Sequence, residues 1–250
     1  MSLPVELRLQ IAAYALEQSA SDIFLPQPKA YQRIKPEYDA TSNLSILLVC
    51  RQFYQDFAKI AFQMTTFILG HNDSTGEVEH CPAQLCEALS TKVSTLWNLR
   101  KVVLELSVCQ SVLEWRNYPF NNEHIHLDEL SVIATVDCDA DFIRYVPWLL
   151  RRLQHVRKIR ILPVAVRSLL YRQSYGNLLG LIYKKDHYDR YDAPNAPDFG
   201  ATWFEPSYND EDTSYDFVAR EPEPMIAEEE YMVMMKPKID HLMDWMSKIS

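Results

Sequence analysis

Histidine and cysteine side chains come together at one place in the chain in a way that suggests metal binding. His80, Cys81 and Cys86 lie close in sequence, and His71 lies nearby. Structural zinc sites use four ligands, usually paired as C-x-x-C or with a similarly short histidine spacing. The spacing here fits neither pattern. We therefore predict a loop with a buried thiol at this place and no zinc site.

A second pair of histidines has a spacing that suits acid–base chemistry. His124 and His126 alternate in "NNEHIHLDEL", so on a strand they would share one face, close to Glu123 and Asp128. Such a pair can hold a metal ion or transfer protons. No third fixed ligand accompanies it, so we predict a polar loop that enters an element. An enzyme or metal site around His124 and His126 stays open as an alternative.

The motifs that usually mark an active site are absent from the sequence. It contains no G-x-S-x-G, no Walker-type glycine loop and no H-E-x-x-H. Its 5 glycines offer few places where backbone can approach a phosphate closely. Cys50 lies in an apolar stretch, which favours the neutral thiol over the thiolate of a nucleophile. We therefore predict no enzyme, no catalytic residues, no metal and no cofactor.

Cysteine usage and hydropathy indicate an intracellular protein, cytoplasmic or nuclear. The 5 cysteines are odd in number and irregular in spacing, as expected for free thiols in a reducing compartment. Glu6 and Arg8 interrupt the first apolar run, which argues against a secretion signal. The longest uncharged stretches are shorter than the roughly 20 residues that cross a bilayer. We therefore expect no membrane partner.

The charges are unevenly distributed along the chain. The net charge is -9, and the acidic residues concentrate between 186 and 230. Five cations instead fall within ten residues, alternating with apolar positions: Arg151, Arg152, Arg157, Lys158 and Arg160. Clustered cations attract phosphates, but this alternation is typical of an exposed face on buried elements. We do not expect a nucleic-acid partner, and the basic run is a possible contact for the acidic segment.

Apolar spacing predicts helices in the first part of the chain. Residues 3–16 place Leu3, Leu7, Ile11 and Tyr14 on one stripe, with Pro4 in the first turn. Residues 17–43 contain three prolines and indicate a loop or a short extended piece. A second helix is predicted through residues 44–64.

The middle of the chain contains β-branched runs that predict strands. They are "TTFIL" at 65–69, "LSVIATV" at 130–136 and the ends of two similar stretches at 96–106 and 150–162. Each of the two similar stretches begins with a helix-like leucine pattern. Helix followed by strand indicates parallel strands or an irregular leucine-rich-repeat-like stack.

The last part of the chain combines an acidic segment with a methionine-rich end. Segment 186–224 holds five prolines and many acidic residues, and it is predicted to be extended or disordered, although its aromatic residues favour contact with the body. Residues 225–250 predict a helix, with Pro237 near its start and a stripe formed by Ile239, Leu242, Met243 and Met246. This helix either docks on the core or binds a partner.

Two stretches of the chain together resemble the F-box motif, especially that of the divergent F-box-like proteins of filamentous fungi. In that family an opening Leu-Pro-x-Glu-Leu begins the first helix, and a later Leu-x-x-Val-Cys-Arg/Lys-x-aromatic run forms the next. The first part is matched by Leu3, Pro4, Glu6 and Leu7. The second part is matched by Leu47 or Leu48, Val49, Cys50, Arg51 and Phe53. Stretch 17–43 separates them, an insertion common in the fungal group.

The resemblance implies a protein-interaction module without catalysis. An F-box binds a Skp-type adaptor of a cullin ubiquitin ligase, while the domain that follows holds a substrate protein. The residues expected to contact the adaptor are Leu3, Pro4, Leu7, Ile11, Leu48, Val49, Cys50 and Phe53. The alternative is a scaffold protein in which the same helices serve only as core.

These observations predict an α+β fold. F-box-like helices pack on a small sheet or an irregular leucine-rich-repeat-like stack, and a helix ends the chain. The expected divisions are an F-box-like helical region (1–70), an α+β region sharing its core (71–185), the acidic segment (186–224) and the methionine-rich helix (225–250).

Overall fold

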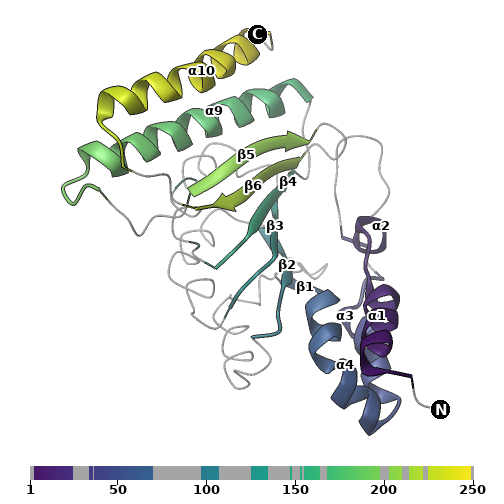
Figure 1. Ribbon diagram of the computed structural model, residues 1–250. Coiled ribbons are helices and arrows are strands. Elements are labelled where there is room, and N and C mark those ends of the chain that lie inside the picture. Colours follow the sequence, from purple (N-terminus) through teal and green to yellow (C-terminus); the bar gives the residue numbers. More distant parts are fainter. Residues whose placement is uncertain are drawn as a thin grey trace.

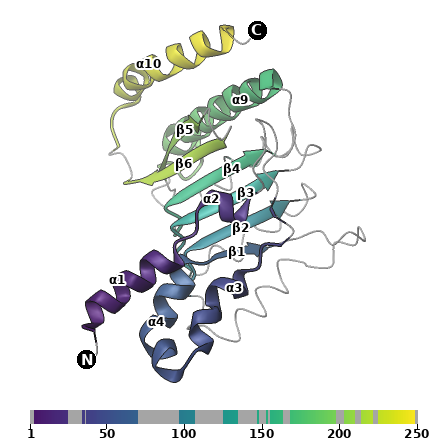
Figure 2. The ribbon, with the colours of Figure 1, turned by 90° about the vertical axis from the view of Figure 1, so that its right-hand side faces the viewer.

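The protein is a mixed helix-and-sheet structure, seen in a computed structural model (Figure 1). The structure describes residues 3–24, 34–35, 37–69, 97–106, 125–134, 147, 153, 155–163, 168–197, 203–209, 214–221 and 225–248. A six-stranded sheet lies at the centre. Two long helices lie at one end of the sheet and a group of N-terminal helices at the other, as both ribbon views show (Figures 1 and 2).

The sheet is parallel over its first four strands. These are β1 (Thr66–Leu69), β2 (Lys101–Leu106), β3 (Glu129–Ala134) and β4 (Lys158–Pro163), paired in sequence order. The four strands predicted from β-branched runs and their parallel arrangement are confirmed. The sequence predicts a helix at the start of the stretch 96–106, but residues 97–100 are not helical and contain a turn. The leucine-rich-repeat-like stack stays a prediction, because much of the chain between the strands lies outside the described residues.

A β-hairpin from the acidic segment completes the sheet. It consists of β5 (Trp203–Asn209) and β6 (Ser214–Arg220), with β6 antiparallel to both β4 and β5. For segment 186–224 the alternative of disorder is therefore wrong at these strands, which are extended and contact the body as the aromatic residues indicated. Their aromatic side chains explain the order, because Phe204, Tyr215 and Phe217 are buried in the main core. Residues 186–192 differ from the prediction, because they are helical.

One face of the sheet packs against α9 (Ser168–His187), a helix not predicted from the sequence. Val132 of β3 and Ile161 of β4 share the main core with Tyr175 and Leu178 of α9. The ring of Tyr175 stacks on that of Tyr215, with 4.7 Å between centroids. Because successive side chains of a strand point to opposite faces of the sheet, every second residue of each strand reaches this face.

The C-terminal helix α10 (Glu228–Ser247) lies along α9 (Figure 1). Its Trp245 meets Tyr175 edge to face, with 5.5 Å between ring centroids. Pro237, expected near the helix start, lies inside the helix. It withholds one backbone hydrogen bond from Val233, whose side chain is exposed. The predicted stripe is split, because Leu242 is buried while Ile239 and Met243 are exposed.

The opposite face of the sheet is covered partly by the segment that follows α1 in the chain, within residues 17–43. It contains α2 (Ala20–Ile23), and Ile23 and Phe24 pack on Val103, Ile133 and Leu162. The prediction of a loop over 17–43 is therefore incomplete: the described part also forms α3 (Ala40–Leu44) and a β-bridge between Phe24 and Ile34. This arrangement joins the N-terminal helices to the sheet.

The N-terminal helices form a small core of their own. Helix α1 (Val5–Leu16) packs on α4 (Arg51–Met64), and a 3-10 turn, η1 (Ser45–Leu48), precedes α4. The buried residues of this core are Ala12, Leu16, Leu47, Phe57 and Ala61. The single helix predicted over 44–64 is wrong, because the chain is interrupted at Val49 and Cys50.

No helix in the described part of the chain is both long enough and apolar enough to span a membrane.

Candidate docking surface

Helix α1 carries apolar side chains on two faces, and only one face is covered. Ala12 and Leu16 are buried against α4. Leu7 and Ile11, which lie on another face, are 46% and 57% exposed. Pro4 is the N-cap of the helix, and its carbonyl oxygen accepts the hydrogen bond from the Arg8 N–H. An apolar face left in solvent beside a buried one is unusual for a helix of a globular protein.

The break before α4 exposes a second group of apolar side chains. Leu48 and Val49 are 87% and 66% exposed. Cys50 is the N-cap of α4 in extended conformation and is also exposed. Cys50 therefore lies just before a helix, and not within one as the helix predicted over 44–64 implied. Phe53 and Tyr54, in the first turn of α4, continue this exposed group.

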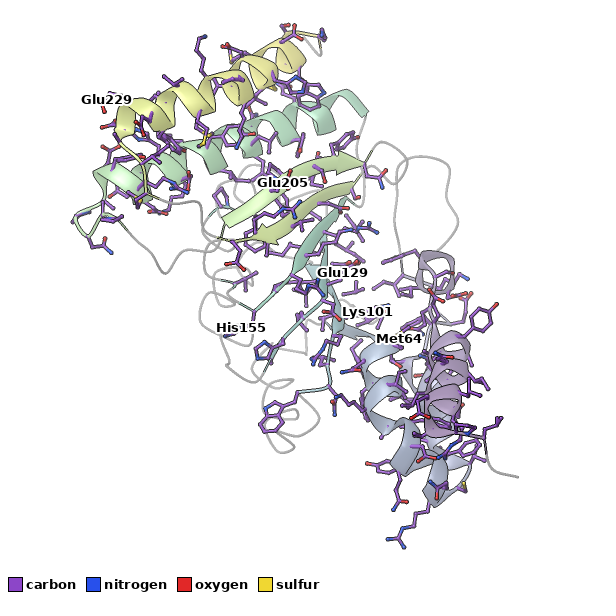
Figure 3. All side chains as sticks on the ribbon, viewed as in Figure 1. Met64, Lys101, Glu129, His155, Glu205 and Glu229 are labelled. Atoms are coloured by element: carbon purple, nitrogen blue, oxygen red, sulfur yellow. The ribbon has the colours of Figure 1, made fainter. Side chains whose placement is uncertain are left out.

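The two groups face solvent near the same end of the helical region. Arg8 pairs with Asp56, whereas Gln18, just after α1, bonds the Thr66 N–H just after α4. The two helices therefore run in the same direction. Met64 ends α4 next to the sheet (Figure 3), so the first turn of α4 lies about 20 Å away from the sheet at 1.5 Å per residue.

The exposed apolar residues of α1, η1 and the start of α4 are here named the apolar surface. Together with Leu3 just before α1, they are Val5, Leu7, Leu9, Ile11, Tyr14, Leu48, Val49, Phe53 and Tyr54. An exposed apolar group of this size typically marks an interaction site.

Polar contacts fix the helices that carry the apolar surface. Asp56 accepts from Arg8 and from the Gln52 amide at 2.9 Å. The Asn43 amide donates to the Leu16 carbonyl at 3.2 Å and to the Thr65 hydroxyl at 2.8 Å. Side-chain bonds across helix termini replace backbone bonds that the termini lack. The helices are thereby held in one arrangement.

The edge strand β1 is tied to the same helices. The Thr66 N–H donates to the Gln18 side chain at 2.8 Å, and its carbonyl accepts from the Tyr38 hydroxyl at 2.6 Å. Burial raises the pKa of Tyr38 further above its ordinary value, which already keeps the hydroxyl protonated at neutral pH. An edge strand exposes backbone groups that otherwise attract other chains. In β1 the N–H and the carbonyl of Thr66 are two such backbone groups, and both already have hydrogen-bond partners within the chain.

All eight residues predicted to contact an adaptor are exposed in the structure. They are Leu3, Pro4, Leu7, Ile11, Leu48, Val49, Cys50 and Phe53. The expected adaptor contacts did not include Val5, Leu9, Tyr14 and Tyr54, which are also exposed in this region. The spacing of Tyr14 three residues after Ile11 was the signal for one of these.

The histidine prediction has a different outcome. His124 lies outside the described residues, and His126 lies beside His155, with 4.6 Å between ring centroids. His155 was not singled out from the sequence, because it is distant in the chain and meets His126 only where β3 and β4 begin (Figure 3). Within the described residues, no group of three His, Cys, Asp or Glu side chains is placed to hold a metal ion. The residues His71, His80, Cys81 and Cys86 lie outside them.

The basic run meets the acidic segment on the sheet. Asp216 of β6 pairs with Lys158 at 2.8 Å and Arg160 at 3.0 Å, both from β4. Burial by itself would raise the pKa of Asp216, but hydrogen bonds from Arg160 and Lys158 outweigh burial and lower this pKa. The expected contact between the two segments is confirmed for these residues. Arg151 and Arg152 lie outside the described residues.

Comparison with known proteins adds no relative: no protein-family model, curated protein or solved structure matches this chain.

Proposed function

We propose that this chain is a non-catalytic, substrate-recruiting F-box-like subunit of a cullin-type ubiquitin ligase, which binds a Skp-type adaptor through the apolar surface. The supporting observation is the exposure of Leu7 and Ile11. Their side chains would be buried if α1 served only as core, and they must be exposed if α1 docks on an adaptor. The order of the motif residues in the sequence supports the same family. The proposal places the protein inside the cell, without a cofactor or a metal.

The apolar surface suits a contact with a helical partner. Leu3, Leu7 and Ile11 recur every four residues, the spacing with which one helix contacts an apolar groove. Removing a leucine-sized side chain from water contributes about 1.5–3 kcal/mol. Several such side chains therefore provide the free energy for a specific complex. The polar contacts of Asp56 and Asn43 keep the helices fixed, so binding costs little ordering.

The test is binding of purified adaptor to the full chain, measured by isothermal titration calorimetry. We expect wild-type protein to bind and Leu7→Asp to lower the affinity at least about tenfold, because a charge enters an apolar contact. The matched control is Val233→Asp on α10, an exposed valine outside the apolar surface. It should leave the affinity unchanged.

Thermal unfolding separates docking from folding. Leu7→Asp should unfold within a few degrees of wild type, because Leu7 is already half exposed. The proposal is wrong if wild-type protein binds no adaptor, or if Leu7→Asp unfolds the protein. The second outcome would favour the scaffold alternative, in which these helices serve only as core.

A further inference from the structure

We propose that α10 pairs with α10 of a second copy of this chain, antiparallel, to form a homodimer. The starting observation is a second exposed apolar group, distant from the apolar surface and on the last helix. Val233 and Met243 are 74% and 65% exposed, and Met232 and Ile239 are exposed as well. This inference is independent of adaptor binding.

Helical spacing places these residues on one stripe, here named the α10 stripe. It consists of Met232, Lys236, Ile239 and Met243, separated by four, three and four residues. An adjoining side of the helix, about a quarter turn away at 3.6 residues per turn, faces α9 through Tyr231, Met235 and Leu242, which are buried. Helix α10 is thus apolar on two sides, with α9 covering one of them (Figure 2).

The order of residues along the stripe selects the occupant. The midpoint between Met232 and Met243 falls between Pro237 and Lys238, and the midpoint between Lys236 and Asp240 falls at Lys238. A twofold axis at this point brings Met232 onto Met243 of the second copy, and Ile239 onto the aliphatic stem of Lys236. A surface that complements itself in this way is what a twofold dimer requires.

Charge complementarity supports the antiparallel direction. Lys236 and Asp240 bond each other within the helix at 2.9 Å, and their side chains are 72% and 63% exposed, so both also reach a neighbour. In the antiparallel pair each Lys236 meets Asp240 of the second copy. A parallel pair would instead place Lys236 beside Lys236, which is repulsive.

Lys238 does not oppose the arrangement, although it lies at the midpoint. It is seven residues from both Tyr231 and Trp245, which face α9, so it lies on that side of the helix and away from the axis.

Methionine side chains adapt to irregular apolar contacts, which suits a stripe of this composition. A single pair of helices buries less than a standard interface, so we expect a dissociation constant on the order of 10 μM.

The experiment is sedimentation velocity of the full chain over a range of concentrations. Wild-type protein should shift reversibly from monomer to dimer, and Met243→Glu, which places a charge against Met232 of the second copy, should stay monomeric. Ile11→Glu, which alters the apolar surface but not the α10 stripe, should dimerise like wild type. Circular dichroism should show equal helix content in all three proteins.

A charge exchange tests the antiparallel register. K236E and D240K should each weaken self-association at least about tenfold, because like charges then meet across the dimer. An equimolar mixture of the K236E and D240K chains should associate again, since every cross-dimer pair is then complementary. Mixing does not repair the pair within either helix, so recovery reports on the contact between copies. A wild-type protein that is monomeric at all concentrations, or a mixture that does not associate, overturns the proposal.

Discussion

The hydroxyl of Tyr231 on α10 donates a hydrogen bond of 2.7 Å to the carboxylate of Asp186 on α9. Asp186 is 1% exposed and also accepts from the Nε–H of Arg190 at 2.9 Å. The guanidinium of Arg190 lies over the Tyr231 ring, 5.5 Å from its centroid. Burial, and then the charge of Asp186, raise the pKa of Tyr231, so its hydroxyl stays a donor at any ordinary pH. This buried contact joins the last two helices.

Tyr231→Phe should destabilise the protein by about 1–3 kcal/mol, because a buried carboxylate loses one of its donors. The measurement is the free energy of unfolding from urea titration at neutral pH. Tyr188→Phe is the control, since Tyr188 lies in the π-helical turn η3 (Tyr188–Asp192) with its side chain exposed. It should change the free energy by less than about 0.5 kcal/mol. Equal effects of the two substitutions would show that the Asp186 contact adds no stability.

Two glycines of α9 should respond oppositely to alanine. A Cβ at Gly176 would overlap the Sδ of Met246 on α10, whereas a Cβ at Gly180 has nothing within 4 Å. Alanine in a helix is favoured over glycine by about 0.8–1 kcal/mol. We therefore expect Gly180→Ala to raise the melting temperature, and Gly176→Ala to lower it because Met246 must move. Differential scanning calorimetry decides, and a gain for Gly176→Ala would mean that α9 and α10 are not in close contact there.

The parallel strands could be predicted from the sequence because each is a short run of β-branched residues. Val102, Val132 and Ile161 identify their strands without knowledge of any partner. Helix α9 could not be predicted as easily, because Gly176 and Gly180 lower its helix propensity. Its apolar residues gain their stability from the sheet, which is a contact distant in sequence.

The β5–β6 hairpin was missed because its local composition favours a loop. Pro206 fits in β5 only because β5 is an edge strand, where a missing N–H costs no ladder bond. Asp216 is tolerated in β6 because Lys158 and Arg160, over 50 residues earlier, neutralise it. Neither fact can be inferred from the segment alone.

The candidate docking residues were predicted by type and spacing, but their exposure depends on where α4 packs against α1.

The ion pairs of Asp216 should make stability sensitive to acid. The pKa of Asp216 in the folded protein lies below its ordinary value of 3.8. The stability that the ionised Asp216 contributes is therefore fully present at pH values above the ordinary pKa. It is lost as the pH falls through the lower pKa of the folded protein. Asp216→Asn should destabilise the protein by about 2 kcal/mol at pH 7. This difference from wild type should shrink below about pH 4.

Urea titrations at several pH values measure that difference. Glu205→Gln is the matched control, because Glu205 pairs with Arg220 on the same hairpin and both side chains are more than half exposed. An exposed pair contributes at most about 1 kcal/mol. A difference between wild type and Asp216→Asn that stays constant from pH 7 to pH 3 would contradict a lowered pKa of Asp216.

Leu7 and Leu16 of α1 should differ strongly in their contribution to stability. Leu16 is 3% exposed and packs with the core of α4, so Leu16→Ala should cost about 2–5 kcal/mol by loss of buried surface and creation of a cavity. Leu7→Ala removes a side chain that is 46% exposed and should cost less than about 1 kcal/mol. Both substitutions keep helix propensity, so the comparison isolates packing. Free energies of unfolding from urea titration give the result. If Leu7→Ala costs as much as Leu16→Ala, the face of α1 that carries Leu7 belongs to the core, and an adaptor could not bind there without unfolding the helices.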